Sequence, residues 1–193
     1  MKLGETMAVT AAGVSLFAVG LPAFSQPTDY LVVSKNSGMC LEDFGNGGGG
    51  DERRHVVLQT PCSSYDSPYS RESSIWETDA GSIGSEDSTT IKSKSSGLCL
   101  GIDAVHGRGI GTVECDVDGP WQQWRIMPAG DATDQDSSSA TYYSIEPVNR
   151  GAKYSLDVRW GSNADLAPAI YWQHHGGDNQ LWMLREPVVA PAH

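Results

Sequence analysis

The feature that most constrains the fold is a triplet ending in tryptophan, which closes three similar stretches of the chain. It reads Gln-Leu-Trp at 180–182, Gln-Gln-Trp at 122–124 and, in a degraded form, Ser-Ile-Trp at 74–76. Before each triplet come an apolar run, a turn of small residues, a second short strand and a third β-rich strand. A repeat of roughly 50 residues built this way cannot bury its own apolar face. Three such repeats therefore predict a shared core inside a closed, threefold-symmetric barrel.

The remaining pattern favours an all-β domain. We place the repeats at about residues 29–80, 87–128 and 141–186, within one domain that spans residues 26–193. No segment in that range keeps a helical period of apolar residues. A sandwich of unrelated short strands is the alternative architecture that the pattern leaves open.

The N-terminal residues and the net charge of the chain limit the cellular locations and the classes of partner that are plausible. Residues 1–25 are predicted to be a signal peptide, because an apolar run at 7–21 precedes small residues at Ala23 and Ser25. A buried helix or a membrane anchor is the alternative, although the run is short for a span. The net charge of -11 argues against nucleic acid and against docking to an anionic membrane. We expect a secreted or periplasmic protein whose mature chain does not insert into a membrane.

The four cysteines are expected to form disulfide bonds if the chain is exported, because an oxidising compartment favours them. They are Cys40, Cys62, Cys99 and Cys115. Spacing alone leaves all three ways of pairing them open.

The triplets, the Gly-Leu-Cys-Leu stretch at 97–100 and the cysteines inside the repeats together resemble the ricin-type lectin family. The resemblance covers about residues 29 to 186. It implies a β-trefoil of three four-stranded repeats with pseudo-threefold symmetry. It also implies that each cysteine pair closes within its repeat, as the repeat alignment selects: Cys40 with Cys62, and Cys99 with Cys115. The third repeat has Ser155 and His174 at the cysteine positions.

The resemblance further implies a carbohydrate-binding site in the third repeat. Sugar hydroxyls bind to a carboxylate and to amides, while the apolar C–H face of a sugar stacks on an aromatic ring. The matching residues are Asp157 for the carboxylate, Trp172 for the ring, and Asn179 and Gln180 for the amides, with His175 as a minor additional contact. Neighbouring strand residues point to opposite faces, so we expect either Trp172 or its neighbour Tyr171 to be exposed. Trp182 is expected in the core.

The first two repeats are degraded at the same positions. The carboxylate and ring positions hold Glu42 and Thr60 in the first repeat, and Gly101 and Val113 in the second. Neither Thr nor Val can stack on a sugar. An irregular site in the second repeat remains an alternative, formed by Asp103, His106 and Trp121.

Nothing in the sequence favours catalysis. There is no nucleophile elbow, zinc-binding helix or phosphate loop. Acidic residues are plentiful, but no pattern places two of them across a cleft. His174 and His175 are adjacent on a predicted strand and point apart, which argues against a metal site. We therefore expect no enzyme activity, cofactor or metal.

The sequence predicts a secreted, non-catalytic lectin that binds a glycan with galactose-like or related sugars through one site in the third repeat. The alternative is a protein-interaction β-trefoil, such as a toxin-delivery subunit or an inhibitor, with a vestigial sugar site and a protein partner. A purely structural fold is a third possibility.

Overall fold

The computed structural model describes residues 27–45, 55–63, 69–103, 109–116, 118–131, 140–151 and 153–190. These residues form strands and short 3-10 helices, with no α-helix among them. The predicted signal peptide at 1–25 lies outside them. The strands are β1 (Pro27–Ser34), β2 (Cys40–Asp43), β3 (His55–Thr60), β4 (Ile75–Asp79), β5 (Lys92–Ser93), β6 (Cys99–Asp103), β7 (Gly109–Val113), β8 (Trp124–Asp131), β9 (Thr141–Pro147), β10 (Tyr154–Val158), β11 (Ala167–Gln173) and β12 (Trp182–Arg185). The 3-10 helices are η1 (Glu72–Ser74), η2 (Ala80–Ser82), η3 (Val148–Arg150), η4 (Arg159–Gly161) and η5 (Asp178–Gln180).

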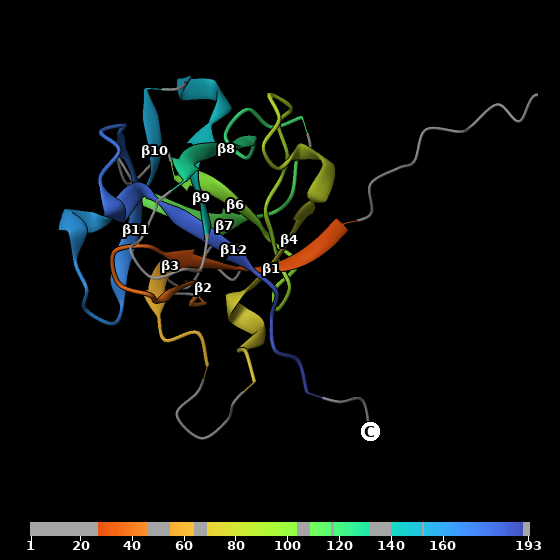
Figure 1. The fold of residues 1–193 in the computed structure, drawn as a ribbon. Coiled ribbons are helices and arrows are strands. Elements are labelled where there is room, and N and C mark those ends of the chain that lie inside the picture. Colours follow the sequence, from red (N-terminus) through yellow and green to blue (C-terminus); the bar gives the residue numbers. More distant parts are fainter. Residues whose placement is uncertain are drawn as a thin grey trace, which may run out of the picture.

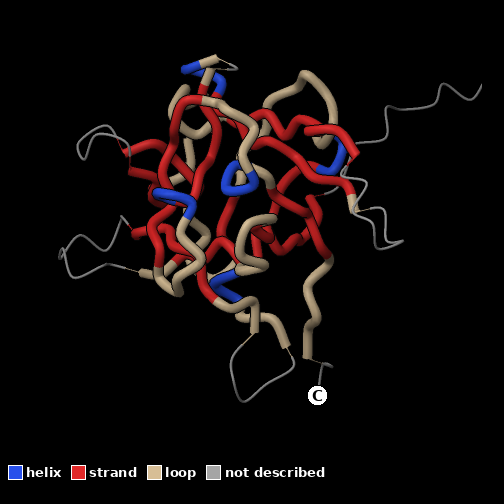
Figure 2. The backbone as a smooth tube through the Cα atoms, turned by 60° about the vertical axis from the view of Figure 1, so that its left-hand side comes forward, coloured by secondary structure: helices blue, strands red, loops and turns tan. Residues whose placement is uncertain are grey.

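Six of the strands form a closed barrel. Their hydrogen-bonded order is β5-β4-β1-β12-β9-β8, and an antiparallel bridge between Thr89 and Trp124 closes the ring. Each unit of four strands contributes its first and last strand to this barrel. In Figure 1 the units follow one another from orange through green to blue, and Figure 2 shows that strands make up most of the body.

The second and third strands of each unit form a hairpin at one end of the barrel. The hairpins are β2–β3, β6–β7 and β10–β11. Their third strands also pair with one another, β3 with β7, β11 with β3 and β11 with β7, which makes a three-cornered cap. This arrangement confirms the predicted all-β, pseudo-threefold β-trefoil, and the sandwich alternative is wrong.

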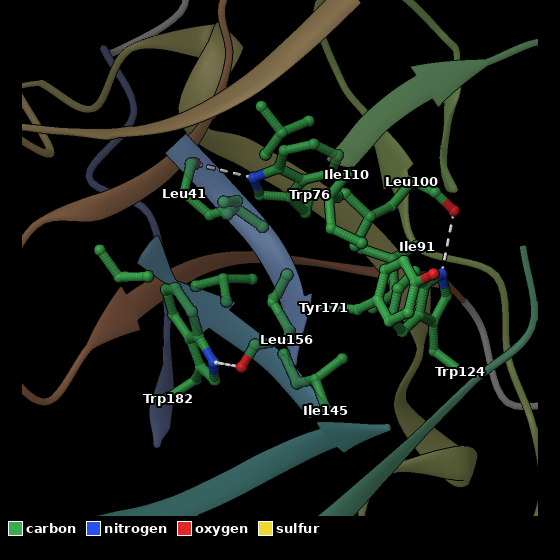
Figure 3. Close-up of a cluster of buried hydrophobic side chains, with 14 of the residues drawn as sticks. Leu41, Trp76, Ile91, Leu100, Ile110, Trp124, Ile145, Leu156, Tyr171 and Trp182 are labelled. Carbon is green, nitrogen blue, oxygen red and sulfur yellow. Dashed lines mark hydrogen bonds between the residues drawn. The ribbon is translucent and has the colours of Figure 1, made fainter. Parts of the chain in front are cut away.

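The core repeats the same contact three times. The tryptophan that ends each triplet is at most 1% exposed, and its indole Nε1 donates a hydrogen bond to a leucine carbonyl on the second strand of its unit. Figure 3 shows the three pairs, which are Trp76 with Leu41 at 2.9 Å, Trp124 with Leu100 at 2.9 Å and Trp182 with Leu156 at 3.1 Å. A buried indole N–H without a partner would be costly, so the contact fixes each closing strand against its hairpin. The prediction that Trp182 lies in the core is confirmed.

Two disulfide bonds close the first two hairpins. Cys40 is bonded to Cys62, and Cys99 to Cys115, as the resemblance implied. They close loops separated by 22 and 16 residues, for which a disulfide contributes about 3 kcal/mol to stability. Disulfide bonds of this kind indicate an extracellular or periplasmic protein. None of the described helices is long and apolar enough to span a membrane.

The third hairpin has a hydrogen bond where the others have a disulfide. Ser155 Oγ lies 2.7 Å from His174 Nδ1. The strand register places Ser155 opposite Trp172, as Cys40 is opposite Thr60 in the first unit. The third unit therefore keeps a side-chain link at this position without a covalent bond.

Candidate functional site

The outward face of the third hairpin carries Asp157 and Trp172. Trp172 pairs with Ser155, two positions before Asp157, so Trp172 and Asp157 are diagonal neighbours on one face of β10–β11. Trp172 is 41% exposed, whereas Tyr171 is 7% exposed and belongs to the core. The expectation that one of the two rings is outside is confirmed, and the outer ring is Trp172.

Gln180 connects the carboxylate to the following loop. Its side chain is fully buried, and its Nε2 donates to Asp157 Oδ2 at 2.8 Å and to the Gln173 carbonyl at 2.9 Å. Its Oε1 accepts hydrogen bonds from the backbone N–H groups of His175 at 2.8 Å and Gly176 at 3.3 Å. One amide thus fixes both the orientation of Asp157 and the course of the loop before η5.

Asn179 completes the group. Its Nδ2 lies 3.5 Å from the carbonyl oxygen of Val158, and its side chain also interacts with the carboxylate of Asp157. The structure therefore brings all four predicted residues to one place: Asp157, Trp172, Asn179 and Gln180.

The carboxylate of Asp157 has an unusual electrostatic environment. Burial raises its pKa above the ordinary value, because the charged form loses water. Hydrogen bonds from Gln180 and Asn179, together with the nearby His175, oppose that shift. The Nε2 of His175 lies 3.6 Å from Asp157 Oδ2, so the imidazole is beside the carboxylate, although the sequence indicated only a minor additional contact.

In the first unit, the corresponding carboxylate is already bound by other side chains of the same protein. Glu42 is buried and accepts hydrogen bonds from Thr60 and from Ser73 Oγ at 2.7 Å. The guanidinium Nη1 of Arg71 lies 3.2 Å from Glu42 Oε2 and forms a salt bridge with it. Sequence reasoning missed Arg71, because no local spacing connects two residues that lie 29 positions apart.

In the second unit, the carboxylate position is Gly101 and offers no acceptor side chain. Trp121 is 39% exposed, but the guanidinium of Arg150 lies over its ring at 4.9 Å from the centroid. The side chain of Asp103 and the whole of His106 lie outside the described residues. The irregular site of Asp103, His106 and Trp121 therefore stays a prediction. Within the described residues, the carboxylate, exposed ring and amide set occurs in the third unit.

Trp160 lies in a helix that packs against η5 of this set, and it was not singled out from the sequence. It belongs to η4, which follows β10 and therefore follows Asp157 by three residues. Trp160 is 86% exposed and has a positive φ of 60°. Its only sequence signal is an aromatic between Arg159 and Gly161 shortly after the carboxylate.

A separate hollow of about 370 Å³ lies over β8 and β9, and Arg125, Glu146 and His174 are among its lining residues. It contains none of the four predicted site residues. No cluster of three or more His, Cys, Asp or Glu residues suited to a metal occurs in the described part of the chain.

The closed six-stranded barrel, its three-cornered cap and the buried tryptophan of each triplet define a β-trefoil of the Gln-x-Trp type. The family described as ricin-type beta-trefoil lectin domain-like matches residues 72–172 and 120–190. The chain belongs to this family.

Solved structures agree on the fold. The Macrolepiota procera ricin B-like lectin, in complex with lactose, is 19% identical, with a TM-score of 0.58 over 87% of this chain and 100% of the lectin. The earthworm R-type lectin C-half, in complex with GalNAc, is 20% identical, with a TM-score of 0.56 over 83% of this chain and 99% of its own. The Haemophilus ducreyi cytolethal distending toxin is 17% identical, with a TM-score of 0.61 over 90% of this chain and 92% of the toxin chain. No curated protein matches the sequence significantly. At these identities the likeness establishes the fold alone.

Proposed function

We propose that this protein is a secreted, non-catalytic lectin that binds galactose-like or related sugars through the third-unit site. The observation that carries the proposal is the assembly of Asp157, Asn179 and Gln180 beside the exposed Trp172, where Gln180 holds the largely buried Asp157 carboxylate in place. The corresponding carboxylate of the first unit is paired with Arg71, and the second unit has none.

Each side chain has a chemical role in this proposal. The ionised carboxylate of Asp157 accepts hydrogen bonds from two sugar hydroxyls, and Asn179 donates to or accepts from a third. Gln180 is a positioning residue, since its amide is fully engaged with Asp157 and the backbone. The ring of Trp172 stacks against the apolar face of the sugar.

The choice of galactose-like sugars draws support from the complexes named above, of a fungal lectin with lactose and of an earthworm lectin with GalNAc. A small polar ligand on a shallow surface buries little area, so we expect a dissociation constant of roughly 0.1–1 mM for a single sugar. Several copies, or a dense glycan surface, would raise the effective affinity.

The test is a glycan screen of the chain from Gln26, followed by calorimetric titration of Asp157→Asn and Trp172→Ala. Trp121→Ala is the matched control, because Trp121 is an exposed tryptophan of similar accessibility in the second unit. We expect both third-unit variants to lose binding at least about tenfold, while the control keeps it. Binding that survives in both third-unit variants would move the site elsewhere. A folded protein that binds no glycan would favour the protein-interaction alternative.

A further inference from the structure

Trp160 is held in a conformation that a bulky residue rarely adopts. Its φ of 60° lies in the left-handed region, where the side chain of an L-residue crowds its own backbone. Its side chain is nevertheless 86% exposed, so burial of the indole does not explain the strain. Strained residues of this kind persist when the surrounding structure fixes them, and they cluster at ligand sites.

The first unit fixes the loop that presents Trp160. Gln59, which is buried, donates from Nε2 to the carbonyl oxygens of Ser162 and Ala164, both at 2.8 Å. Asn36 Nδ2 donates to the carbonyl oxygen of Gly161 at 2.9 Å. The loop after β10 is therefore preorganised by side chains that lie more than a hundred residues earlier in the sequence.

The same loop borders the sugar site. A Cβ placed on Gly161 would lie 3.8 Å from Asn179 Cγ, and η4 packs against η5. The guanidinium of Arg159 lies 4.4 Å from the centroid of the Trp160 ring, where a cation–π contact restricts its motion. Trp160 is thus an exposed ring on the segment that packs beside Asn179.

Two exposed rings lie on segments next to Asp157: Trp172 is on the paired strand, and Trp160 is in the 3-10 helix that follows β10. Trp172 is paired with Ser155, which precedes Asp157 by two residues. Trp172 and Asp157 are therefore offset by about 7 Å along the strand direction. Trp160 comes three residues after Asp157, beyond the end of β10. A sugar that stacks on Trp172 and binds Asp157 leaves the Trp160 ring for another part of the ligand.

We propose that Trp160 is a second stacking ring, so that the site binds at least two linked sugar residues rather than one. The first sugar contacts Asp157 and Trp172, and the next sugar places its apolar C–H face on Trp160. This inference rests on the proposed function of the third unit. The ligand class is accordingly an oligosaccharide whose second residue is a pyranose with an open C–H face.

The test compares each single sugar with an oligosaccharide that contains it, referred to as its oligomer: galactose with lactose, and xylose with xylotriose. Wild type, Trp160→Ala and Trp160→Phe are titrated by calorimetry, with Leu166→Ala as the matched control. Leu166 is an exposed residue of the same loop that also has a positive φ. Circular dichroism and the midpoint of denaturant unfolding verify that each variant is folded.

We expect wild type to bind at least one oligomer about five- to tenfold more tightly than its single sugar, which is the strength of one aromatic contact. Trp160→Ala removes that advantage and leaves the affinity for the single sugar within about twofold. Trp160→Phe keeps most of the advantage, and Leu166→Ala keeps all of it.

Three results would overturn the inference while leaving the proposed function intact. They are wild type without preference for an oligomer, an unchanged preference in Trp160→Ala, and equal weakening of single sugar and oligomer in that variant. Wild type that binds neither single sugars nor oligomers would instead reject the proposed function, and the inference with it.

Discussion

Gln180 and Gln122 occupy the same place in two units, and the main difference between them is that Gln180 also binds a carboxylate. Gln122 Nε2 donates to the Glu114 carbonyl at 2.9 Å, and its Oε1 accepts from the Asp116 N–H at 3.0 Å. Gln180 makes the same pair of backbone contacts, accepts a longer hydrogen bond from the Gly176 N–H at 3.3 Å, and donates to the carboxylate of Asp157 at 2.8 Å. The two residues therefore differ by the hydrogen bond to a buried carboxylate and by one long, weak backbone contact.

The expected magnitudes follow from these contacts. Gln122→Ala removes two neutral hydrogen bonds and leaves their backbone partners less satisfied, which should lower the free energy of unfolding by about 2 kcal/mol. Gln180→Ala also removes a bond to an ionised group, a loss of about 2 kcal/mol more. We therefore expect Gln180→Ala to lose about 4 kcal/mol in total.

Denaturant unfolding of wild type and both variants at neutral pH measures the difference. In acid, the difference between the losses of the two variants should become smaller, because a protonated Asp157 makes only a neutral hydrogen bond with Gln180. Losses that agree within about 0.5 kcal/mol at neutral pH would contradict the reasoning, since the carboxylate would then contribute nothing through Gln180.

Four further predictions concern the third unit. Because burial raises the pKa of Asp157, sugar titrations across the acid range should lose binding at a pH above the ordinary value of an aspartate, about 3.9. The same shift means that the charge of Asp157 lowers the free energy of unfolding at neutral pH, and this cost disappears as the pH falls through the raised pKa. If the free energy of unfolding of Asp157→Asn had the same pH dependence as that of wild type, this reasoning would be contradicted. Ser155→Cys combined with His174→Cys should form a third disulfide across a separation of 19 residues and raise the free energy of unfolding by about 3 kcal/mol under oxidising conditions, with no gain in reductant. Trp160→Gly should raise the free energy of unfolding by about 1 kcal/mol in the same assay, by relieving the positive φ, and an unchanged or lower value would refute the strain.

The fold was predictable because its signals are local and repeated. Each Gln-x-Trp triplet places a tryptophan on a barrel strand, and the pattern of short strands before it is the same in three units. Alternation along a strand also predicted that one of Trp172 and Tyr171 is exposed and the other buried, and the family resemblance pointed to Trp172 as the exposed ring. The cysteine pairing needed the repeat alignment and the family resemblance, because spacing alone left three possibilities.

The surroundings of the site were less predictable, because they depend on contacts between distant segments. Arg71 pairs with Glu42 across 29 residues, and Gln59 holds Ser162 across 103. The left-handed conformation of Trp160 has no signature in a stretch without a turn glycine at that position. Such features arise from tertiary contacts, which have no local sequence pattern.

The dependence of the third unit on Gln59 limits how the protein can be made multivalent. The hairpin register places Gln59 opposite Leu41 and Tyr171 opposite Leu156, so the two residues are symmetry equivalents. A trivalent protein assembled from three copies of the third repeat would have tyrosine at every such position. Each copy would then carry the sugar-facing residues but would lack the glutamine amide that, as Gln59 does here, fixes the loop after the second strand of a neighbouring unit. Engineering three equal sites would therefore require a glutamine in place of Tyr171 in every repeat, together with repacking of the core around it.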